Sequence, residues 1–187
     1  MECDTLLLSV GLIPENELTR EAGAEISDMG GPIVNNNLET TIEGVFACGN
    51  VLQVHDLVDL VTVEAKRAGL NAVEYIKNRY GVKKGKRDQI KCIPGENINY
   101  IKPDLINKTD LEIDIIFTFR VKRPERRILI QFKDENNKIL YKKKRRYVIP
   151  SEMLELKLNL SELKIEPNCK EIIVEVIPRP EVLIEED

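Results

Sequence analysis

The hydrophobic pattern of the chain changes near residue 80, and this change constrains the fold more than any other feature of the sequence. Residues 4–80 combine short apolar runs, glycine turns and one long helical pattern, which is typical of an α/β unit. Residues 81–88 are basic, contain two glycines and have no periodicity, which predicts an exposed linker. We therefore expect domains at residues 1–80 and 96–187, joined by a linker at residues 81–95.

The second half alternates apolar and polar side chains in short runs, which predicts strands with one buried face. These runs fall at residues 111–119, 128–132, 139–141, 154–160 and 172–176. A polar turn at residues 134–138 predicts a hairpin between the second and third runs. Short strands without a helical pattern predict a small all-β domain, an antiparallel sandwich of the immunoglobulin-like kind.

Five consecutive basic residues, 142–146, lie inside this strand region. Side chains of a strand point alternately to opposite faces, so at most three of the five share one surface. Two interpretations remain: the basic residues protect an edge strand against unwanted pairing, or they dock an acidic partner. No aromatic stacking platform accompanies them, so we do not expect single-stranded nucleic acid to bind here.

Composition excludes several function classes. The net charge of -4 gives no global reason to expect nucleic acid or an anionic membrane as a partner. Apolar runs are far shorter than the roughly 20 residues of a membrane helix, and the acidic start does not resemble a secretory signal. The four cysteines form no C-x-x-C pair and His55 is the only histidine, so we expect no metal site, buried thiols and a cytoplasmic location.

Two segments of the first half carry the chemical signal. Residues 3–16 predict an apolar strand, a turn at Gly11 and a helix start after Pro14. Residues 41–50 predict a turn and a short buried strand that leaves through Gly49 into Asn50. Because Gly49 has no side chain, the backbone at this strand end can approach a ligand closely.

A helical pattern follows over residues 57–80, with Asp56 as the expected N-cap. Its expected packed face consists of small and apolar residues: Val61, Ala65, Ala68, Ala72 and Ile76.

The two segments, in this order, resemble the late motifs of the FAD/NAD-linked reductases, a family that includes thioredoxin reductase and NADH oxidase. The later motif of that family runs from Thr to a small residue, Gly and Asp; here it runs from Thr41 to Gly49, with Asn50 in the place of Asp. The resemblance covers residues 1–80 and implies a Rossmann-like FAD-binding domain. Residues 6–59 and, more weakly, the second half also resemble flavoproteins found alongside anaerobic glycerol-3-phosphate dehydrogenases, in which a short β domain follows the flavin domain.

The resemblance implies that the chain contributes part of an FAD site. In related enzymes the Asp at position 50 accepts a hydrogen bond from a ribityl hydroxyl; Asn50 keeps an acceptor oxygen but loses the charge. The amino end of the following helix is aimed at the flavin pyrimidine edge in that family, where its partial positive charge favours the reduced ring. The implied cofactor-binding residues are Gly11, Gly49, Asn50, Val51, Asp56, Leu57, Val58 and Asp59.

Two side chains near this site each have two possible roles. His55 is either a proton donor during flavin reduction or a loop histidine that bonds locally near the helix start. Cys48 either lies within reach of the cofactor or packs in the core.

The sequence contains no G-x-G-x-x-G loop, which normally cradles the FAD pyrophosphate. We therefore expect a carboxy-terminal fragment, or one product of a split gene, of an FAD-dependent NAD(P)H oxidoreductase that is inactive alone. Expected partners are the amino-terminal flavin- and nicotinamide-binding portion, a second copy of the chain and a redox partner of the glycerol-3-phosphate dehydrogenase type, without membrane insertion. The alternative is a non-catalytic module whose β-sandwich docks a partner.

Overall fold

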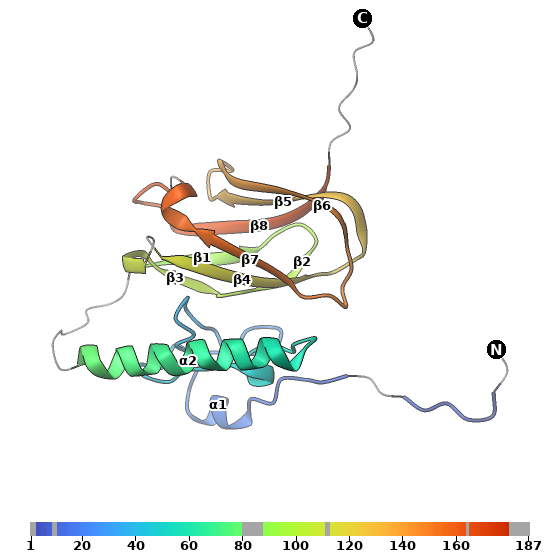
Figure 1. The fold of residues 1–187 in the computed structure, drawn as a ribbon, viewed down its shortest axis with the longest axis horizontal. Coiled ribbons are helices and arrows are strands. Elements are labelled where there is room, and N and C mark those ends of the chain that lie inside the picture. Colours follow the sequence, from blue (N-terminus) through green and yellow to red (C-terminus); the bar gives the residue numbers. More distant parts are fainter. Residues whose placement is uncertain (1–2, 9–10, 80–87, 111–112, 164, 180–187) are drawn as a thin grey trace, which may run out of the picture.

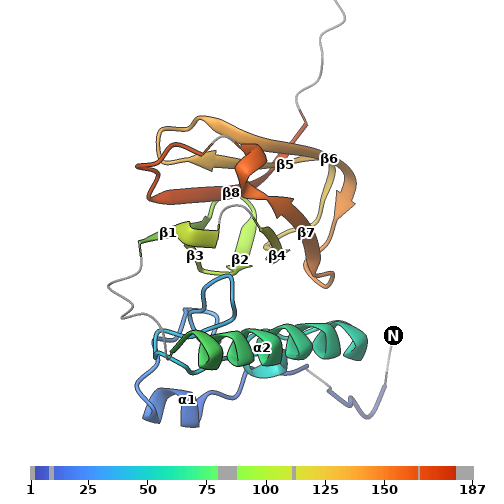
Figure 2. The same cartoon turned by 60° about the vertical axis from the view of Figure 1, so that its left-hand side comes forward.

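The computed structural model of the protein describes residues 3–8, 11–79, 88–110, 113–163 and 165–179. Residues 11–79 form a layer dominated by one long helix, and residues 88–179 form a β domain stacked on that layer (Figures 1 and 2). We call the first part the amino-terminal unit. Within the described part of the chain, no helix combines the length and the hydrophobicity that a membrane crossing requires.

The β domain consists of two sheets around one core. Its strands are β1 (Gln89–Pro94), β2 (Ile98–Lys102), β3 (Leu105–Asn107), β4 (Asp114–Val121), β5 (Glu125–Asp134), β6 (Ile139–Val148), β7 (Leu154–Asn159) and β8 (Glu171–Pro178). The five-stranded sheet has the order β3-β1-β8-β5-β6 and the three-stranded sheet the order β2-β4-β7, with short 3-10 turns at Lys108–Asp110 (η2) and Leu160–Leu163 (η3). Side chains of both sheets meet in a single cluster that includes Phe117, Phe119 and Phe132, all fully buried.

The predicted alternation of buried and exposed side chains is confirmed in several strands. In β7 every second residue from Leu154 to Leu158 is buried, and β8 buries Ile172, Val174 and Val176 completely. The predicted hairpin is confirmed as β5 and β6, whose turn is closed by the Asp134 carboxylate accepting hydrogen bonds from the backbone N–H groups of Asn136 and Lys138. β6 is the last strand in the order of its sheet, which confirms the edge position expected for residues 142–146.

Two predictions about the β domain differ from the structure. The sheets are not purely antiparallel, because β1 pairs in parallel with β8 over Lys91 to Pro94. The predicted linker of residues 81–95 is too long at its carboxy-terminal end, since β1 occupies Gln89–Pro94 and buries Ile90 and Cys92. Residues 80–87 lie outside the described residues. An immunoglobulin-like arrangement remains a prediction.

The amino-terminal unit contains α1 (Glu17–Glu21), the 3-10 turn η1 (Gly49–Val51) and α2 (Val58–Arg79). The strand predicted within residues 3–10 is wrong for its described part: residues 3–8 pair with nothing and Leu6, Leu7 and Leu8 are exposed. A strand needs a neighbour for its backbone groups, and the described chain offers none here. The second predicted strand is reduced to isolated bridges, with Phe46 opposite Glu39 and the Ala47 N–H donating to Leu38 O at 2.9 Å.

The helix predicted over residues 57–80 is confirmed as α2, but its packed face is rotated from the predicted one. Ala68 is buried as expected, whereas Ala65 and Ile76 are exposed. Glu64, which is not part of the predicted packed face, is only 7% exposed. The sequence pattern misleads because a face made of Val61, Glu64 and Ala68 mixes apolar and charged positions, so hydrophobicity alone does not mark it.

The amino-terminal unit is joined to the β domain along residues 32–37 and 102–110. Asn35 forms a parallel bridge with Leu105, and Lys102 Nζ donates to Pro32 O at 2.8 Å. The Asp110 carboxylate accepts hydrogen bonds from Asn36 Nδ2 and Asn37 Nδ2, both at 2.9 Å. Because these contacts include backbone pairing and buried polar side chains, the two parts share a specific interface.

Candidate functional site

The turn expected to meet the cofactor is the 3-10 turn η1. Gly49 is buried with φ 69°, a left-handed conformation that glycine adopts without strain, and Asn50 is exposed. A Cβ at position 49 would meet Val61 Cγ1 of α2 at 3.3 Å, so the turn lies close against the first turns of the helix. Glycine is thus required here both by the backbone angle and by the approach of α2.

A buried carboxylate organises this turn. Glu64 of α2 accepts hydrogen bonds from the Gly49 backbone N–H at 2.6 Å and from Gln53 Nε2 at 2.8 Å. His55 Nε2 lies 3.0 Å from Glu64 Oε1. A buried carboxylate is costly unless it is hydrogen-bonded, and these contacts satisfy the Glu64 carboxylate. They also join the η1 turn, the connector of residues 52–57 and α2 to one another.

His55 lies inside the structure. Its side chain is only 3% exposed, and its Nδ1 atom has no hydrogen-bond partner among the described residues. The contact with Glu64 is a local bond near the start of α2, in line with one of the two interpretations of this histidine. The other, proton donation to a reduced or reducing flavin, stays a prediction.

Asn50 and the start of α2 lie together. Asn50 Oδ1 accepts a hydrogen bond from the His55 backbone N–H at 3.3 Å, two residues before the connector reaches Leu57. Leu57 and Val58 are 62% and 76% exposed, and Asp59 is exposed as well. The residues expected at the ribityl chain and at the ring are therefore neighbours on an accessible surface.

Asp56 does not cap α2 as expected. Its Oδ1 pairs with Arg120 Nη2, and its Oδ2 accepts a hydrogen bond from the Met153 backbone N–H at 2.7 Å. Both partners belong to the β domain, and they draw the carboxylate away from the helix. No other side chain of the described residues accepts a hydrogen bond from the N–H groups of Val58 and Asp59, so the positive end of α2 is uncapped.

The turn offers further free donors. Among the described residues, no partner accepts from the backbone N–H group of Asn50 or from Asn50 Nδ2. Together with the amino end of α2, these groups form a surface rich in N–H donors. Such a surface suits the hydroxyls, carbonyls and anionic edges of a dinucleotide cofactor, so the residues present fit the group that the resemblance implies.

Gly11 lies on an exposed segment with φ 89°, and its contact with the other candidate residues is indirect. The adjacent Leu12 lines a cavity of about 190 Å³ together with Gln53 and Val54 from the connector and Tyr100 and Arg120 from the β domain. Asn16 Nδ2 donates to Val51 O at 2.8 Å, which brings the first predicted motif to the turn of the second.

All four cysteines are free thiols. Cys3 is exposed, contrary to the expectation of buried thiols, whereas Cys92 and Cys169 are buried and Cys48 is half-buried. Burial raises the pKa of the Cys48 thiol, and the nearby Glu64 carboxylate raises it further, so this thiol is not activated for chemistry. The described residues contain no group of three or more His, Cys, Asp or Glu side chains arranged to hold a metal ion.

The sequence interpretation missed Glu64 and Gln53, which form the centre of the site. A carboxylate on α2 four positions before Ala68 carried a signal, because it lies on the same helical face as a residue expected to be buried. Gln53 carried no such signal, since its role depends on Thr118, 65 positions along the chain.

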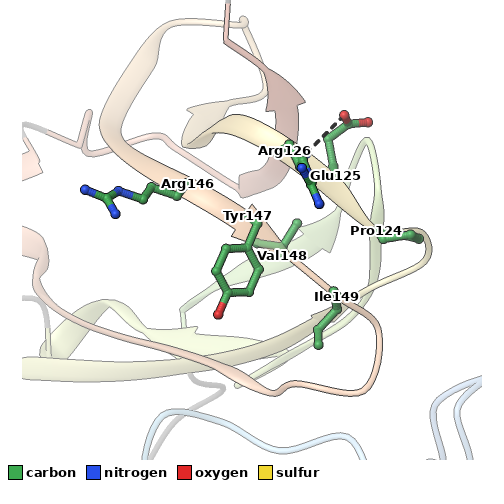
Figure 3. Close-up of a pocket in the computed structure, with 7 residues that line it drawn as sticks. All are labelled: Pro124, Glu125, Arg126, Arg146, Tyr147, Val148 and Ile149. Carbon is green, nitrogen blue, oxygen red and sulfur yellow. Dashed lines mark hydrogen bonds between the residues drawn. The ribbon is translucent and has the colours of Figure 1, made fainter.

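A second hollow lies on the β domain, away from this site. It is an open groove of about 750 Å³ lined by Arg126, Arg146, Tyr147 and Ile149, with Pro124, Glu125 and Val148 completing it (Figure 3). Tyr147 is 54% exposed, and neither arginine has an ion-pair partner among the described residues.

Comparison with known proteins shows the class of protein to which the chain belongs, an oxidoreductase family. The family model described as pyridine nucleotide-disulphide oxidoreductase matches residues 1–100, and the chain belongs to this family. Members of the family typically use a flavin and NAD(P)H. No curated protein matches the chain, and no solved structure matches it either.

Proposed function

We propose that the chain supplies one wall of the FAD site of an NAD(P)H-dependent oxidoreductase. In this proposal Asn50 binds a ribityl hydroxyl, and the free N–H groups at the start of α2 face the pyrimidine edge of the flavin. The glycine loop that holds the pyrophosphate, and the nicotinamide site, come from polypeptide outside these 187 residues. The chain alone is inactive.

One observation carries the proposal: the Asn50 side chain bonds to the His55 N–H, three residues before α2 begins, and both Asn50 and the uncapped end of α2 are accessible. The family match to residues 1–100 supports it, because that segment contains both groups. When bound, FAD supplies the hydride and electron transfer. The residues of this chain bind and orient the ring, while the buried Glu64 holds the Gly49 turn in place.

We further propose that the redox partner is of the glycerol-3-phosphate dehydrogenase type. The support is the resemblance of residues 6–59, and more weakly of the second half, to flavoproteins found beside such dehydrogenases. A second copy of the chain is another proposed partner, since Val63, Leu70, Val73 and other apolar side chains are exposed on α2.

Flavin uptake tests the proposed function. The purified chain is titrated with FAD, alone and mixed with a polypeptide that carries the glycine loop of a flavin domain, and flavin fluorescence is followed. We expect saturable uptake with a dissociation constant below about 10 μM in the mixture. Asn50→Ala should weaken binding by about 1 kcal/mol, or roughly fivefold, because it removes one neutral hydrogen bond.

A matched control is Asn136→Ala, in the turn between β5 and β6, which should leave flavin binding unchanged. Equal affinity of Asn50→Ala and the unaltered chain would remove Asn50 from the site. A mixture in which flavin fluorescence shows no saturable change would refute the flavin function.

The groove of Figure 3 favours a second candidate function, a module that docks an acidic protein partner through the β domain. Arg126 and Arg146 both line the groove, and the described residues provide no carboxylate partner for either. Two cations without a partner beside one groove favour an anionic ligand there. Reversal of Arg146 to Glu should abolish capture of an acidic partner and leave FAD uptake unchanged.

A further inference from the structure

We propose that the β domain positions the flavin-contacting turn, through Thr118 and Arg120 of β4. This inference rests on the proposed function, and it assigns a role to a domain that the flavin chemistry itself does not require. The segment concerned is the connector of residues 52–57, between the η1 turn and α2.

The connector needs external support. Its only internal ties to the turn are the backbone N–H groups of Leu52 and Gln53, which donate to Gly49 O at 2.9 and 3.0 Å, and the weak bond from His55 N to Asn50. Residues 53–57 form no regular secondary structure. A connector of this kind keeps a fixed position only if side chains from elsewhere hold it.

The first support is a chain of buried hydrogen bonds. Thr118 Oγ1 contacts both ends of the Gln53 side-chain amide, at 2.9 Å to Nε2 and 3.0 Å to Oε1. Gln53 Nε2 donates to Glu64 Oε2, and Glu64 Oε1 accepts from the Gly49 N–H. Gln53, Glu64 and Thr118 are each at most 7% exposed, so no water competes for these bonds.

The second support is cationic. Arg120 Nη2 donates to Val54 O at 3.1 Å and pairs with the Asp56 carboxylate, while its Nη1 reaches Pro150 O at 3.3 Å. The Met153 N–H, just before β7, holds the other oxygen of Asp56. The guanidinium thus fixes the connector at two points and leaves the first N–H groups of α2 free for a ligand.

Strand geometry explains why β4 suits this task. Successive side chains of a strand point to opposite faces, so Thr118 and Arg120 face the connector while Phe117 and Phe119 are locked in the core of the β domain. The two parts of the protein are already joined along residues 32–37 and 102–110. Thr118 and Arg120 therefore provide a second, separate attachment, and every hydrogen bond that they form with the amino-terminal unit falls on the connector.

The test compares three single-site variants of the 187-residue chain by amide hydrogen exchange without flavin. Thr118→Val removes the hydroxyl at nearly constant volume, Thr118→Ser keeps it, and Ile115→Val weakens the core on the other face of β4. Each Gly49 rate is divided by that of Phe119, to remove changes in global stability. We expect Gly49 to exchange about tenfold faster in Thr118→Val than in Ile115→Val, with Thr118→Ser close to the unaltered chain.

A second arm repeats the FAD titration, in which Thr118→Val should weaken binding severalfold and Thr118→Ser should not. Equal Gly49 exchange in Thr118→Val and Ile115→Val would overturn the positioning role, and flavin binding by the unaltered chain would show that the proposed function survives. If the unaltered chain and its mixture take up no FAD, the proposed function fails, and the role of Thr118 and Arg120 toward the flavin fails with it.

Discussion

The β domain and the amino-terminal unit are held together by opposite means. Of the eleven largest fully buried side chains, ten belong to the β domain and only Leu52 belongs to the amino-terminal unit. Conversely, the unit carries most of the large exposed hydrophobic residues, from Leu12 to Ile76. Apolar burial thus defines the β domain, whereas the unit depends on buried polar contacts such as those of Glu64.

This difference assigns most of the stabilising apolar core to the β domain and the candidate binding surface to the amino-terminal unit. A region that buries its apolar side chains completely has little surface left for a ligand, while one that leaves them exposed is prepared to pack against another polypeptide. The candidate flavin site lies in the amino-terminal unit, and hydrogen bonds from β4 of the β domain hold it in place. Substitutions in the two regions should accordingly have different consequences.

The largest effect is expected in the β core. Phe117→Ala removes a fully buried ring that packs edge-on against Phe132 and should destabilise the domain by about 3–5 kcal/mol. Leu70→Ala on α2 should change stability by less than about 0.5 kcal/mol, because Leu70 is 58% exposed. Urea denaturation measures the change in the free energy of unfolding of both variants. Equal changes would contradict the proposed difference between the two regions.

The next effect concerns the polar network of the unit. Glu64→Ala leaves the Gly49 N–H, the Gln53 amide and His55 without their common acceptor, which should cost about 2–3 kcal/mol. Lys66→Ala, at an exposed position of α2, serves as the control. Helix loss followed by circular dichroism in urea measures the change, and a Glu64 variant as stable as the Lys66 variant would refute the role of the network.

Two glycines of the unit should respond with opposite signs. Gly49→Ala forces a left-handed residue and a 3.3 Å contact with Val61, which should destabilise by about 1–2 kcal/mol. Gly69→Ala, in the middle of α2 with open space around it, should stabilise by up to about 1 kcal/mol. Thermal unfolding distinguishes them, and a shift of the same sign in both would contradict the structure of the η1 turn.

The smallest effect is a pH dependence at the interface between the regions. Burial acts to raise the pKa of Asp110, but hydrogen bonds from Asn36, Asn107, Thr109 and Asn37 outweigh it and the pKa is lowered. A lowered pKa in the folded state means that this contribution to stability is present above the ordinary value of 3.8 and is lost as the pH falls below it. Asp110→Asn should flatten the stability profile in this acidic range, and an unchanged slope would remove Asp110 from the interface.

The β domain was the more predictable region, because a strand with one buried face shows an alternation of apolar and polar residues in the local sequence. The alternation at residues 154–160 fixed both the strand β7 and its buried face. The parallel pairing of β1 with β8 was not predictable, since it joins segments about 80 residues apart and leaves no local signal.

The candidate site was predictable only in part. The turn at Gly49 and the helix after it were readable from glycine, small residues and helical spacing. The N-cap role of Asp56 was wrong, because Arg120 and Met153 from the β domain compete for the same carboxylate. Contacts of this kind decide which groups remain free for a ligand, and they depend on the packing of the two regions.

The most direct test of the central claim is a map of amide chemical shifts of the isotope-labelled chain during titration with FAD. We expect the largest changes at Asn50, Val58 and Asp59, whose N–H groups have no acceptor among the described residues, and at Gly49 and Val51 beside them in the turn. Changes confined to the groove around Arg126 and Arg146, or no changes at the turn with flavin at saturating concentration, would contradict it.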